Sequence, residues 1–328
     1  MSASQSTSGS AVANLNTDTD TPALLEDHPA LSVCSFGLTD IGRVRSANQD
    51  QFLVAVLLKA LQVEHTSLPQ RRIQHSPDRS HLFVVADGMG GHAGGEQASA
   101  LAIDSVETFI LKSFKWFAEF KEPEQDQVLT DFQTALAEAN ARVLAEAKDW
   151  PELSGMGTTL TLAYSLNDVL FIAHVGDTRC YLRRQGTLYR LTRDHTLVEE
   201  MIRNGTVAIA DASKHHLRHV ITNAVGGKSA NLKVEVHRLA LEASDRVLLC
   251  SDGLTGMLTD DEINQILHAE EEPDEACRQL VARANQAGGR DNITVVVADF
   301  RIAASPTQRD ENDLSGFGLE SPTAVCLE

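Results

Sequence analysis

The feature that most restricts the fold is a pair of very short connections between apolar segments in the middle of the chain. Residues 158–164, 169–175 and 179–183 have the apolar, β-branched character of strands, and only the turns at 166–168 and 176–177 separate them. Connections this short join antiparallel neighbours, because a parallel pair needs a crossover of a dozen residues or more. We therefore expect these three segments to be neighbouring antiparallel strands.

The rest of the chain supplies further strands and two pairs of helices. The other expected strands are 33–38, 52–57, 81–86, 232–238, 246–250 and 292–300. Apolar residues recur at intervals of three and four over 98–109 and 128–143, and helices are also expected at 260–268 and 274–287. Antiparallel strands with helices in pairs predict an α+β layered sandwich, not a doubly wound parallel sheet.

Residues 1–30 and 304–328 differ in composition from the sequence between them. Both segments lack apolar periodicity and carry mostly acidic charge, so we expect disordered tails on either side of one domain at 31–303. A polar insertion at about 64–80 separates two expected strands, and its default interpretation is a surface loop.

Composition excludes several classes of protein. The chain has 28 basic and 46 acidic residues, and a net charge of −18 argues against binding to nucleic acid. We find neither a leader peptide nor an apolar run of the roughly 18 residues that a membrane span needs. The five cysteines form no C-x-x-C pair, so neither a disulfide framework nor a thiolate zinc site is indicated. We expect a cytoplasmic protein that binds neither nucleic acid nor a membrane.

Aspartates recur where apolar strands begin or end. Asp87, Asp177 and Asp252 each lie at a glycine-bearing turn after such a strand, whereas Asp50 and Asp291 come just before one. Each aspartate alone is typical of a turn. Several carboxylates at one edge of a sheet would repel one another unless a cation held them, and oxygen ligands suit Mg²⁺ or Mn²⁺. The repeated pattern therefore predicts a metal site.

The glycine cluster at 88–93 allows an alternative, because it satisfies the dinucleotide fingerprint G-x-G-x-x-G/A. Two features argue against this alternative. Asp87 would place a negative charge against the pyrophosphate, and Glu107, the acidic residue nearest the ribose position, lies inside an expected helix instead of at a strand end. A nicotinamide-dependent oxidoreductase would show nicotinamide binding and no metal dependence. A P-loop is excluded, since no Gly-Lys-Ser/Thr follows.

Six motifs in a fixed order carry a resemblance to a known family. They are TDIGRVRSANQD at 39–50, DGMGGH at 87–92, GMGTT at 155–159, VGDTR at 175–179, SDGL at 251–254 and GRDN at 289–292. The series, over about residues 32–301, resembles the bacterial branch of the metal-dependent PP2C (PPM) Ser/Thr protein phosphatases. The resemblance implies a four-layer αββα sandwich of two antiparallel sheets flanked by helix pairs, with a binuclear Mn²⁺ or Mg²⁺ centre at one edge.

The resemblance also implies ligands for the metal centre. Asp87 would bridge the two ions and the carbonyl of Gly88 would complete one of them. Asp252 and Asp291 would bind the other ion, and Asp50 would contact the centre through coordinated water.

A third, weaker ion and the substrate complete the implied site. Asp177 would hold the third ion together with Asp252, and Arg45 would grip the substrate phosphate. Arg43 lies two residues away on an extended segment and would point to the opposite face. The implied reaction is in-line attack on phosphorus by a water or hydroxide that bridges two metal ions. Arg179 and Arg290 are expected to form structural salt bridges instead.

The sequence departs from the family pattern at two positions. Gln49 stands where the family usually has Glu, and we expect it, with Asn292, just outside the metal ligands, where an amide can bond a metal-bound water. Met89 occupies the position of a histidine proposed as general acid in eukaryotic members. His92 is a candidate replacement, although a histidine at a helix start is more often structural.

The resemblance finally implies substrates and partners. We expect phosphoserine and phosphothreonine proteins as substrates, a cognate Ser/Thr kinase as the opposing enzyme, and a monomer. A non-catalytic relative that only binds phosphoproteins is the alternative that Gln49 raises, although every implied metal ligand is present. His215, His216 and His219 lie in a polar stretch and are expected to face solvent, unless a helix there lets them hold a transition metal.

Overall fold

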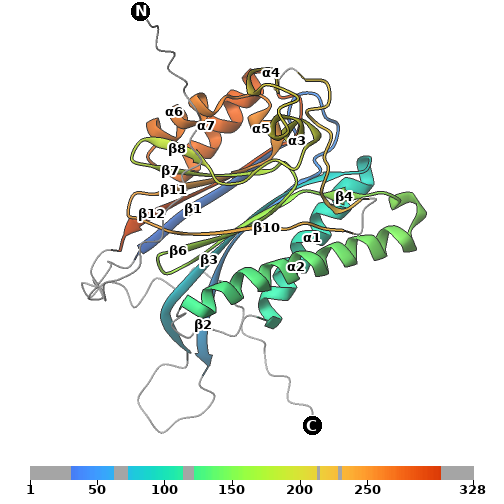
Figure 1. The fold of residues 1–328 in the computed structure, drawn as a ribbon. Helices are drawn as coiled ribbons and strands as arrows, with labels where there is room; N and C mark the ends of the chain where they lie inside the picture. The colour runs from blue at the N-terminus through green and yellow to red at the C-terminus, as the bar shows by residue number, and fades with distance from the viewer. Residues whose placement is uncertain (1–30, 63–72, 114–121, 213–214, 228–230, 304–328) are drawn as a thin grey trace, which may run out of the picture.

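Two antiparallel sheets stacked face to face form the centre of the computed structural model (Figure 1). The structure describes residues 31–62, 73–113, 122–212, 215–227 and 231–303. Both expected tails, at 1–30 and 304–328, and residues 64–72 of the expected insertion lie outside the described residues. No helix in the described part of the chain combines the length and the apolar character needed to cross a membrane.

One sheet has five strands and the other has seven. The first runs in the order β1 (Leu31–Asp40), β12 (Ile293–Ile302), β11 (Arg246–Cys250), β7 (Arg179–Arg184) and β8 (Thr187–Arg190). The second runs in the order β10 (Glu235–Ala240), β6 (Val169–Val175), β5 (Leu160–Leu166), β3 (Ile73–Met89), β4 (Gly157–Thr158) and β9 (Val225–Gly226), with β2 (Asp50–Gln62) paired to β3.

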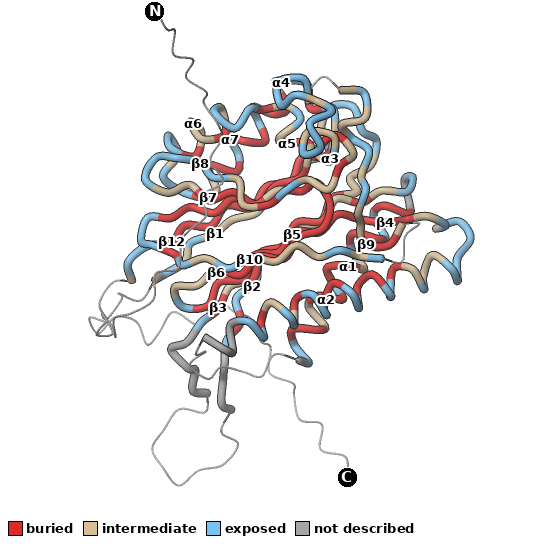
Figure 2. The backbone as a smooth tube through the Cα atoms, viewed as in Figure 1, coloured by how far each residue is buried: buried red, intermediate tan, exposed pale blue. Residues whose placement is uncertain are grey.

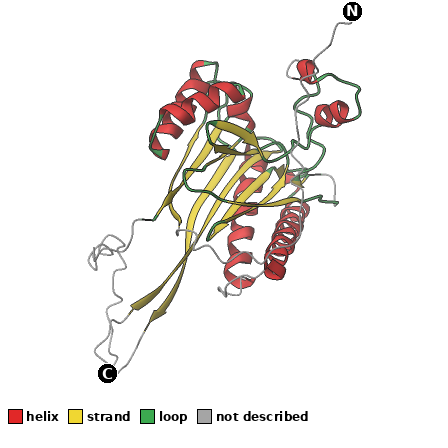
Figure 3. Ribbon diagram, turned by 60° about the vertical axis from the view of Figure 1, so that its left-hand side comes forward, coloured by secondary structure: helices red, strands yellow, loops and turns green. Residues whose placement is uncertain are grey.

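Helices cover the outer face of each sheet (Figure 3). On the seven-stranded sheet lie α1 (His92–Ser113) and α2 (Glu122–Asp149), and the short 3-10 helix η1 (Pro151–Leu153) follows them. On the five-stranded sheet lie α5 (Asp252–Thr255), α6 (Asp260–Ala269) and α7 (Pro273–Gln286). Two further short helices, α3 (Leu197–Arg203) and α4 (Ile209–Ala212), lie between β8 and β9 in the chain. The predicted four-layer α+β sandwich is confirmed.

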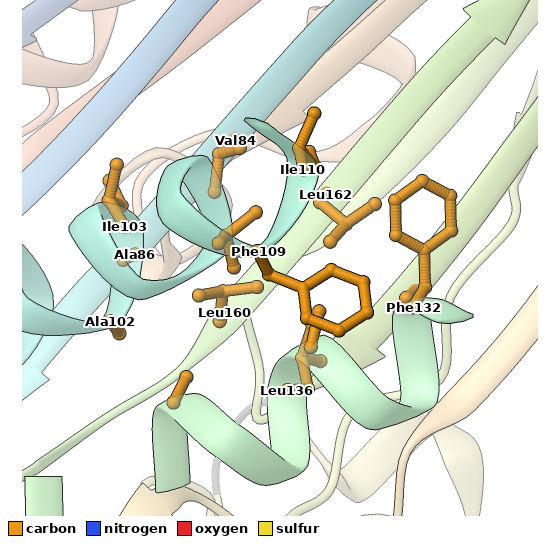
Figure 4. Packing of buried hydrophobic residues seen from close by; sticks show 14 of the residues in the cluster. Val84, Ala86, Ala102, Ile103, Phe109, Ile110, Phe132, Leu136, Leu160 and Leu162 are labelled. Atoms are coloured by element: carbon orange, nitrogen blue, oxygen red, sulfur yellow. The ribbon is translucent and has the colours of Figure 1, made fainter. Parts of the chain in front are cut away.

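The central strands are apolar on both faces, and β3 shows why. Leu82, Val84 and Ala86 belong to the core under α1 and α2, whereas Phe83 and Val85 belong to the core between the sheets. Because successive side chains of a strand point to opposite faces, both sets are buried only if both faces are covered. Figure 4 shows Val84 and Ala86 against the helices, and Figure 2 shows the buried strands between the two helical layers.

One prediction about the short connections is wrong. β5 and β6 pair antiparallel as expected, but β7 belongs to the other sheet, next to β11. The turn at 176–177 carries the chain from one sheet to the other, with Gly176 at φ +111°. A side chain at Gly176 would put its Cβ 2.4 Å from the Cβ of Thr159, so the crossing requires glycine. A short connection excludes a parallel neighbour, but it does not keep both strands in one sheet.

Other differences concern the ends and the polar segments. Strand β3 begins at Ile73, inside the expected insertion, and β2 extends to Gln62, so the two strands form a longer hairpin than the apolar runs indicated. Strand β10 begins three residues later than expected. β8 and the short helices α3, α4 and α5 were not expected from the sequence, because each spans only four to seven residues, too few for a periodic pattern to mark it.

Candidate metal and phosphate site

A cavity of about 680 Å³ lies at one edge of the sandwich, where strands of both sheets begin or end. Its lining consists of Val44, Arg45, Ser46, Ala47, Gln49, Asp87, Gly88, Met89, Gly90, Gly91, Asp177, His219, Ile221, Asp252, Asp291 and Asn292. The end of β3, the turn between the two sheets, the start of α5 and the segment before β12 each supply one aspartate. Four of the five predicted carboxylates and the predicted Gly88 therefore share this cavity.

The fifth carboxylate, Asp50, lies beneath the cavity floor. It is 2% exposed, and it stands opposite Asp87 in the register of β2 and β3. The hydroxyl of Thr294 donates a hydrogen bond of 2.7 Å to its Oδ2 atom. The structure thus brings all five predicted aspartates into one cluster, with Asp50 behind the others.

Burial and mutual repulsion disfavour the charged form of the clustered aspartates. Burial raises the pKa of Asp87 well above its ordinary value, and the nearby carboxylates of Asp50 and Asp252 raise it further. Burial likewise raises the pKa of Asp177, and it raises the pKa of Asp50 to about 7. The Oδ1 atoms of Asp50 and Asp177 are buried without a hydrogen-bond partner. A divalent cation bound here would stabilise the charged form of these buried, mutually repelling carboxylates.

The donor set fits ions that keep part of their water. Among the residues that the structure describes, no three acidic, histidine or cysteine side chains lie close enough together to hold one ion by themselves. The carboxylates surround the cavity instead. Mg²⁺ binds proteins through one or two carboxylates and retains several waters, and the clustered aspartates supply oxygen atoms, which Mg²⁺ and Mn²⁺ prefer.

Arg45 and Asp291, which were expected to bind different partners, contact each other. The guanidinium of Arg45 donates a hydrogen bond of 2.6 Å to Oδ2 of Asp291, and this bond raises the pKa of Arg45. The Arg45 side chain remains 52% exposed, so it can also face the cavity. Arg43 does not line the cavity, but the expected alternation along an extended segment is wrong, because residues 42–44 form a turn and Val44 lines the cavity next to Arg45.

Asn292 holds the loop that carries Arg45. Its side-chain amide donates to the carbonyls of Ile41 (3.0 Å) and Ala47 (2.9 Å), and its Oδ1 atom accepts from the backbone N–H of Gln49 (2.9 Å). Asn292 is buried, and these three bonds close the loop at both ends. It lines the cavity, and its side-chain contacts are with backbone groups, so its expected place just outside the metal ligands stays a prediction.

Gln49 contacts the glycine-rich turn of the motif at 87–92. Its Nε2 atom donates to the carbonyl of Gly91 at 2.6 Å, and its backbone carbonyl accepts from the N–H of Gly88 at 3.2 Å. A Cβ atom at Gly88 would lie 2.1 Å from the carbonyl oxygen of Gly95, so only glycine fits there. The expected bond from Gln49 to a metal-bound water stays a prediction, and the amide nitrogen already serves the turn.

The structure places the remaining candidates as follows. His219 faces solvent as expected, and it also lines the cavity, with its Nδ1 atom 3.6 Å from Oδ2 of Asp252. Its side chain is 59% exposed, and no signal in the sequence distinguishes it from its neighbours. Arg179 forms the expected structural pair, donating to both carboxylate oxygens of Asp194 at 2.9 and 2.7 Å. Met89 lines the cavity, and the side chain of His92 lies outside the described residues.

The expectation for Arg290 is wrong for the described part of the chain. Arg290 is exposed, and none of the ion pairs among the described residues includes it. It directly precedes Asp291 in the segment between α7 and β12, and no acidic side chain that the structure describes forms an ion pair with it.

Comparisons with known proteins agree with this geometry. Residues 70–294 match the family model of protein phosphatase 2C. The chain is 32% identical over 264 residues to the serine/threonine phosphatase stp of Listeria innocua, covering 80% of this chain and 94% of that protein. It is 36% identical over 220 residues to the serine/threonine protein phosphatase PstP of Mycobacterium tuberculosis, covering 67% of this chain and 40% of that protein.

Solved structures give the same result. The crystal structure of the phosphatase PstP/Ppp of M. tuberculosis has a TM-score of 0.66 at 32% identity, covering 82% of this chain and 99% of that one. The catalytic domain of PstP in complex with two manganese ions has a TM-score of 0.65 at 30% identity, covering 83% and 99%. Each similarity covers more than four fifths of this chain.

Proposed function

The chain belongs to the protein phosphatase 2C family and is a metal-dependent Ser/Thr protein phosphatase, and we propose that the carboxylate cluster is its catalytic metal centre. The observation that supports this assignment most is the clustering itself. Buried carboxylates whose pKa values rise by desolvation and mutual repulsion meet at a cavity that an arginine also lines. Residues 31–303 would form the catalytic domain.

The resemblance to the family implies the ligand roles, and the positions of these residues around the cavity are compatible with them. Asp87, next to Gly88, would contact two ions, and Asp252 and Asp291 would complete the second. Asp177 lies beside Asp252 and would help to hold a third ion, whereas Asp50, buried behind Asp87, would act through water. The ions would be Mn²⁺ or Mg²⁺, and the two manganese ions in the PstP structure support the choice.

Each group of the chain then has a chemical task. When bound, the ions would lower the pKa of water and offset the charge on the phosphoryl oxygens. The guanidinium of Arg45 would orient the phosphate through its planar set of donors, moving between Asp291 and the substrate. Asn292 would keep the Arg45 loop in place by its three bonds to backbone groups. No residue needs to form a covalent phosphoenzyme.

The substrates would be proteins phosphorylated on serine or threonine by a cognate kinase, with the chain acting as a monomer in the cytoplasm. The catalytic assignment distinguishes this enzyme from a relative that only binds phosphoproteins. Such a relative would bind phosphopeptide and metal without turnover.

The test is hydrolysis of para-nitrophenyl phosphate and of a phosphothreonine peptide by the purified protein, with Mn²⁺, without it and with a chelator. Turnover should require the metal, and Asp87→Asn or Asp252→Asn should lower it by at least about a hundredfold. Asp149→Asn, at an exposed aspartate at the end of α2, is the matched control and should keep full activity. Near-native turnover in Asp87→Asn at saturating Mn²⁺ would show that the ligand assignment is wrong.

A further inference from the structure

A second cavity, of about 660 Å³, adjoins the catalytic cavity and shares Asp177, His219 and Asp252 with it. One wall comes from the short helices α3 and α4, and the other from α5 and the start of α6. We call this second cavity the flanking groove. A polypeptide whose phosphorylated residue reaches the catalytic cavity can therefore place a neighbouring residue in the flanking groove.

The wall formed by α3 and α4 carries several apolar side chains beside Glu199. Val198, Ile202 and Ala212 line it, and Ile209 on α4 adds a side chain that is 72% exposed. Leu258, which precedes α6, faces the groove from the opposite wall. An aliphatic side chain bound here would cover apolar surface on both walls, and the exposed Ile209 would gain most from that contact.

The opposite wall carries a carboxylate without a structural task. The first turn of α6 is closed by a capping box between Thr259 and Glu262, and Asp260 accepts a hydrogen bond of 2.9 Å from the hydroxyl of Tyr181. Asp261 is exposed and makes no hydrogen bond or ion pair with any residue that the structure describes. A carboxylate in the first turn suits the helix dipole, and it also leaves a free negative charge in the groove.

The basic residues of the groove are mostly engaged. Arg179 and Arg190 both contact Asp194, with Arg190 also 3.9 Å from Glu199, so these two arginines offer little free charge. Arg218 is the remaining basic residue of the lining. With the two acidic residues at the start of α6 opposite it, the part of the groove away from the metal ligands has a negative balance.

We propose that the flanking groove binds the residues next to the phosphoserine or phosphothreonine, with an aliphatic side chain against Ile209 and a lysine or arginine against Asp261. The inference rests on the proposed function, since it places the phosphate in the catalytic cavity. It adds a substrate preference that the metal centre alone cannot supply, because the centre contacts only the phosphate and Arg45 contacts the same group.

The experiment compares phosphothreonine peptides of equal length that differ only at the positions beside phosphothreonine. In one set, isoleucine or arginine is placed at each of the three positions before or after phosphothreonine. In the matched set, serine replaces isoleucine and glutamate replaces arginine. Hydrolysis of para-nitrophenyl phosphate, which is too small to extend into the groove, is measured in parallel. We expect the Ile/Arg peptides to have a kcat/KM at least about fivefold higher at one flank.

Two variants test the two walls separately. Ile209→Ser should lower the ratio of peptide to aryl phosphate kcat/KM by about fivefold and remove the isoleucine preference. Asp261→Lys should reverse the charge preference, so that glutamate peptides become the better substrates. Leu111→Ser, at an α1 residue that is 65% exposed and does not line either cavity, is the control and should leave the ratio unchanged.

The outcomes separate the two proposals. Hydrolysis of aryl phosphate without any flank preference would overturn the groove proposal and leave the metal centre intact. A preference for glutamate in the unaltered protein would show that Arg218, and not Asp261, sets the charge preference of the groove. That result would also overturn the groove proposal. Failure to hydrolyse either substrate with Mn²⁺ would overturn the proposed function itself, and the groove proposal with it.

Discussion

Replacing Asn292 by alanine tests whether the loop that carries Arg45 is held by one side chain. Asn292 makes three hydrogen bonds, two to the carbonyls of Ile41 and Ala47 and one to the N–H of Gln49. Alanine would leave these three backbone groups without their partner, in a place where Asn292 itself is only 4% exposed. The loop then has to move until water reaches those groups.

The expected magnitude follows from the count of bonds. A hydrogen bond contributes about 1 kcal/mol net to stability, and a buried group left without a partner costs about 1–3 kcal/mol. Because part of the loop is exposed, water can satisfy some of the freed groups, so we expect a loss of about 3 kcal/mol in the free energy of unfolding. We also expect a fall of at least about tenfold in kcat/KM, since small misplacements of a positioning group have effects of this size.

The assay is urea unfolding of the metal-free protein together with kinetics on a phosphothreonine peptide. Asn264→Ala is the matched control, because Asn264 also donates to a backbone carbonyl, that of Gly186 at 3.0 Å, but lies away from the cavity. If Asn292 acts through Arg45, its effect on kcat/KM should nearly disappear in an Arg45→Ala background. Fully additive kinetic losses would refute the reasoning, even if the stability loss had the expected size.

Three further predictions concern single residues. Arg45→Ala should raise KM for phosphopeptide without weakening Mn²⁺ binding, because the Asp291 carboxylate loses only its bond to the guanidinium; calorimetry with Mn²⁺ showing a large loss of affinity would contradict this. Gln49→Glu should destabilise the metal-free protein by about 1–2 kcal/mol, since a carboxylate cannot donate to the carbonyl of Gly91, and urea unfolding would show no change if that bond were unimportant. His174 is fully buried, and burial lowers its pKa to about 4, so the unfolded chain takes up a proton first and stability falls as the pH drops below about 6.5. At pH 5 this loss should be about 2 kcal/mol, and unfolding of His174→Gln at pH 7.5 and pH 5 should lack it.

The layered fold could be predicted because its main signal is local. Apolar runs in the sequence coincide with strands such as β5 and β11. The spacing of three and four residues between apolar positions in α1 and α2 marks one buried face of each helix. The sheet to which β7 belongs could not be predicted, since it depends on how the chain turns at Gly176 and not on the composition of β7. The short helices α3 and α4, with seven and four residues, are too short for a periodic pattern to mark them.

The aspartates of the site could be predicted, but their surroundings could not. Asp87, Asp177 and Asp252 share a visible pattern of apolar strand, turn and glycine. The pairing of Arg45 with Asp291 and the approach of His219 to Asp252 join residues that are distant in the chain, and no local pattern records such contacts. The flanking groove is likewise formed by segments that come together only in the folded protein.

The glycines beside the aspartates explain why the pattern was visible at all. Carboxylates from two sheets can surround one cavity only if the backbones at the strand ends approach each other closely. A Cβ atom at Gly88 would lie 2.1 Å from the carbonyl oxygen of Gly95, and one at Gly253 would lie 1.9 Å from the carbonyl oxygen of Asn292. The residue after Asp87 and the residue after Asp252 must therefore lack a side chain, whatever the metal. The Asp-Gly pairs thus record two requirements at once, a charge for the ion and a close approach of the backbone that brings the charges together.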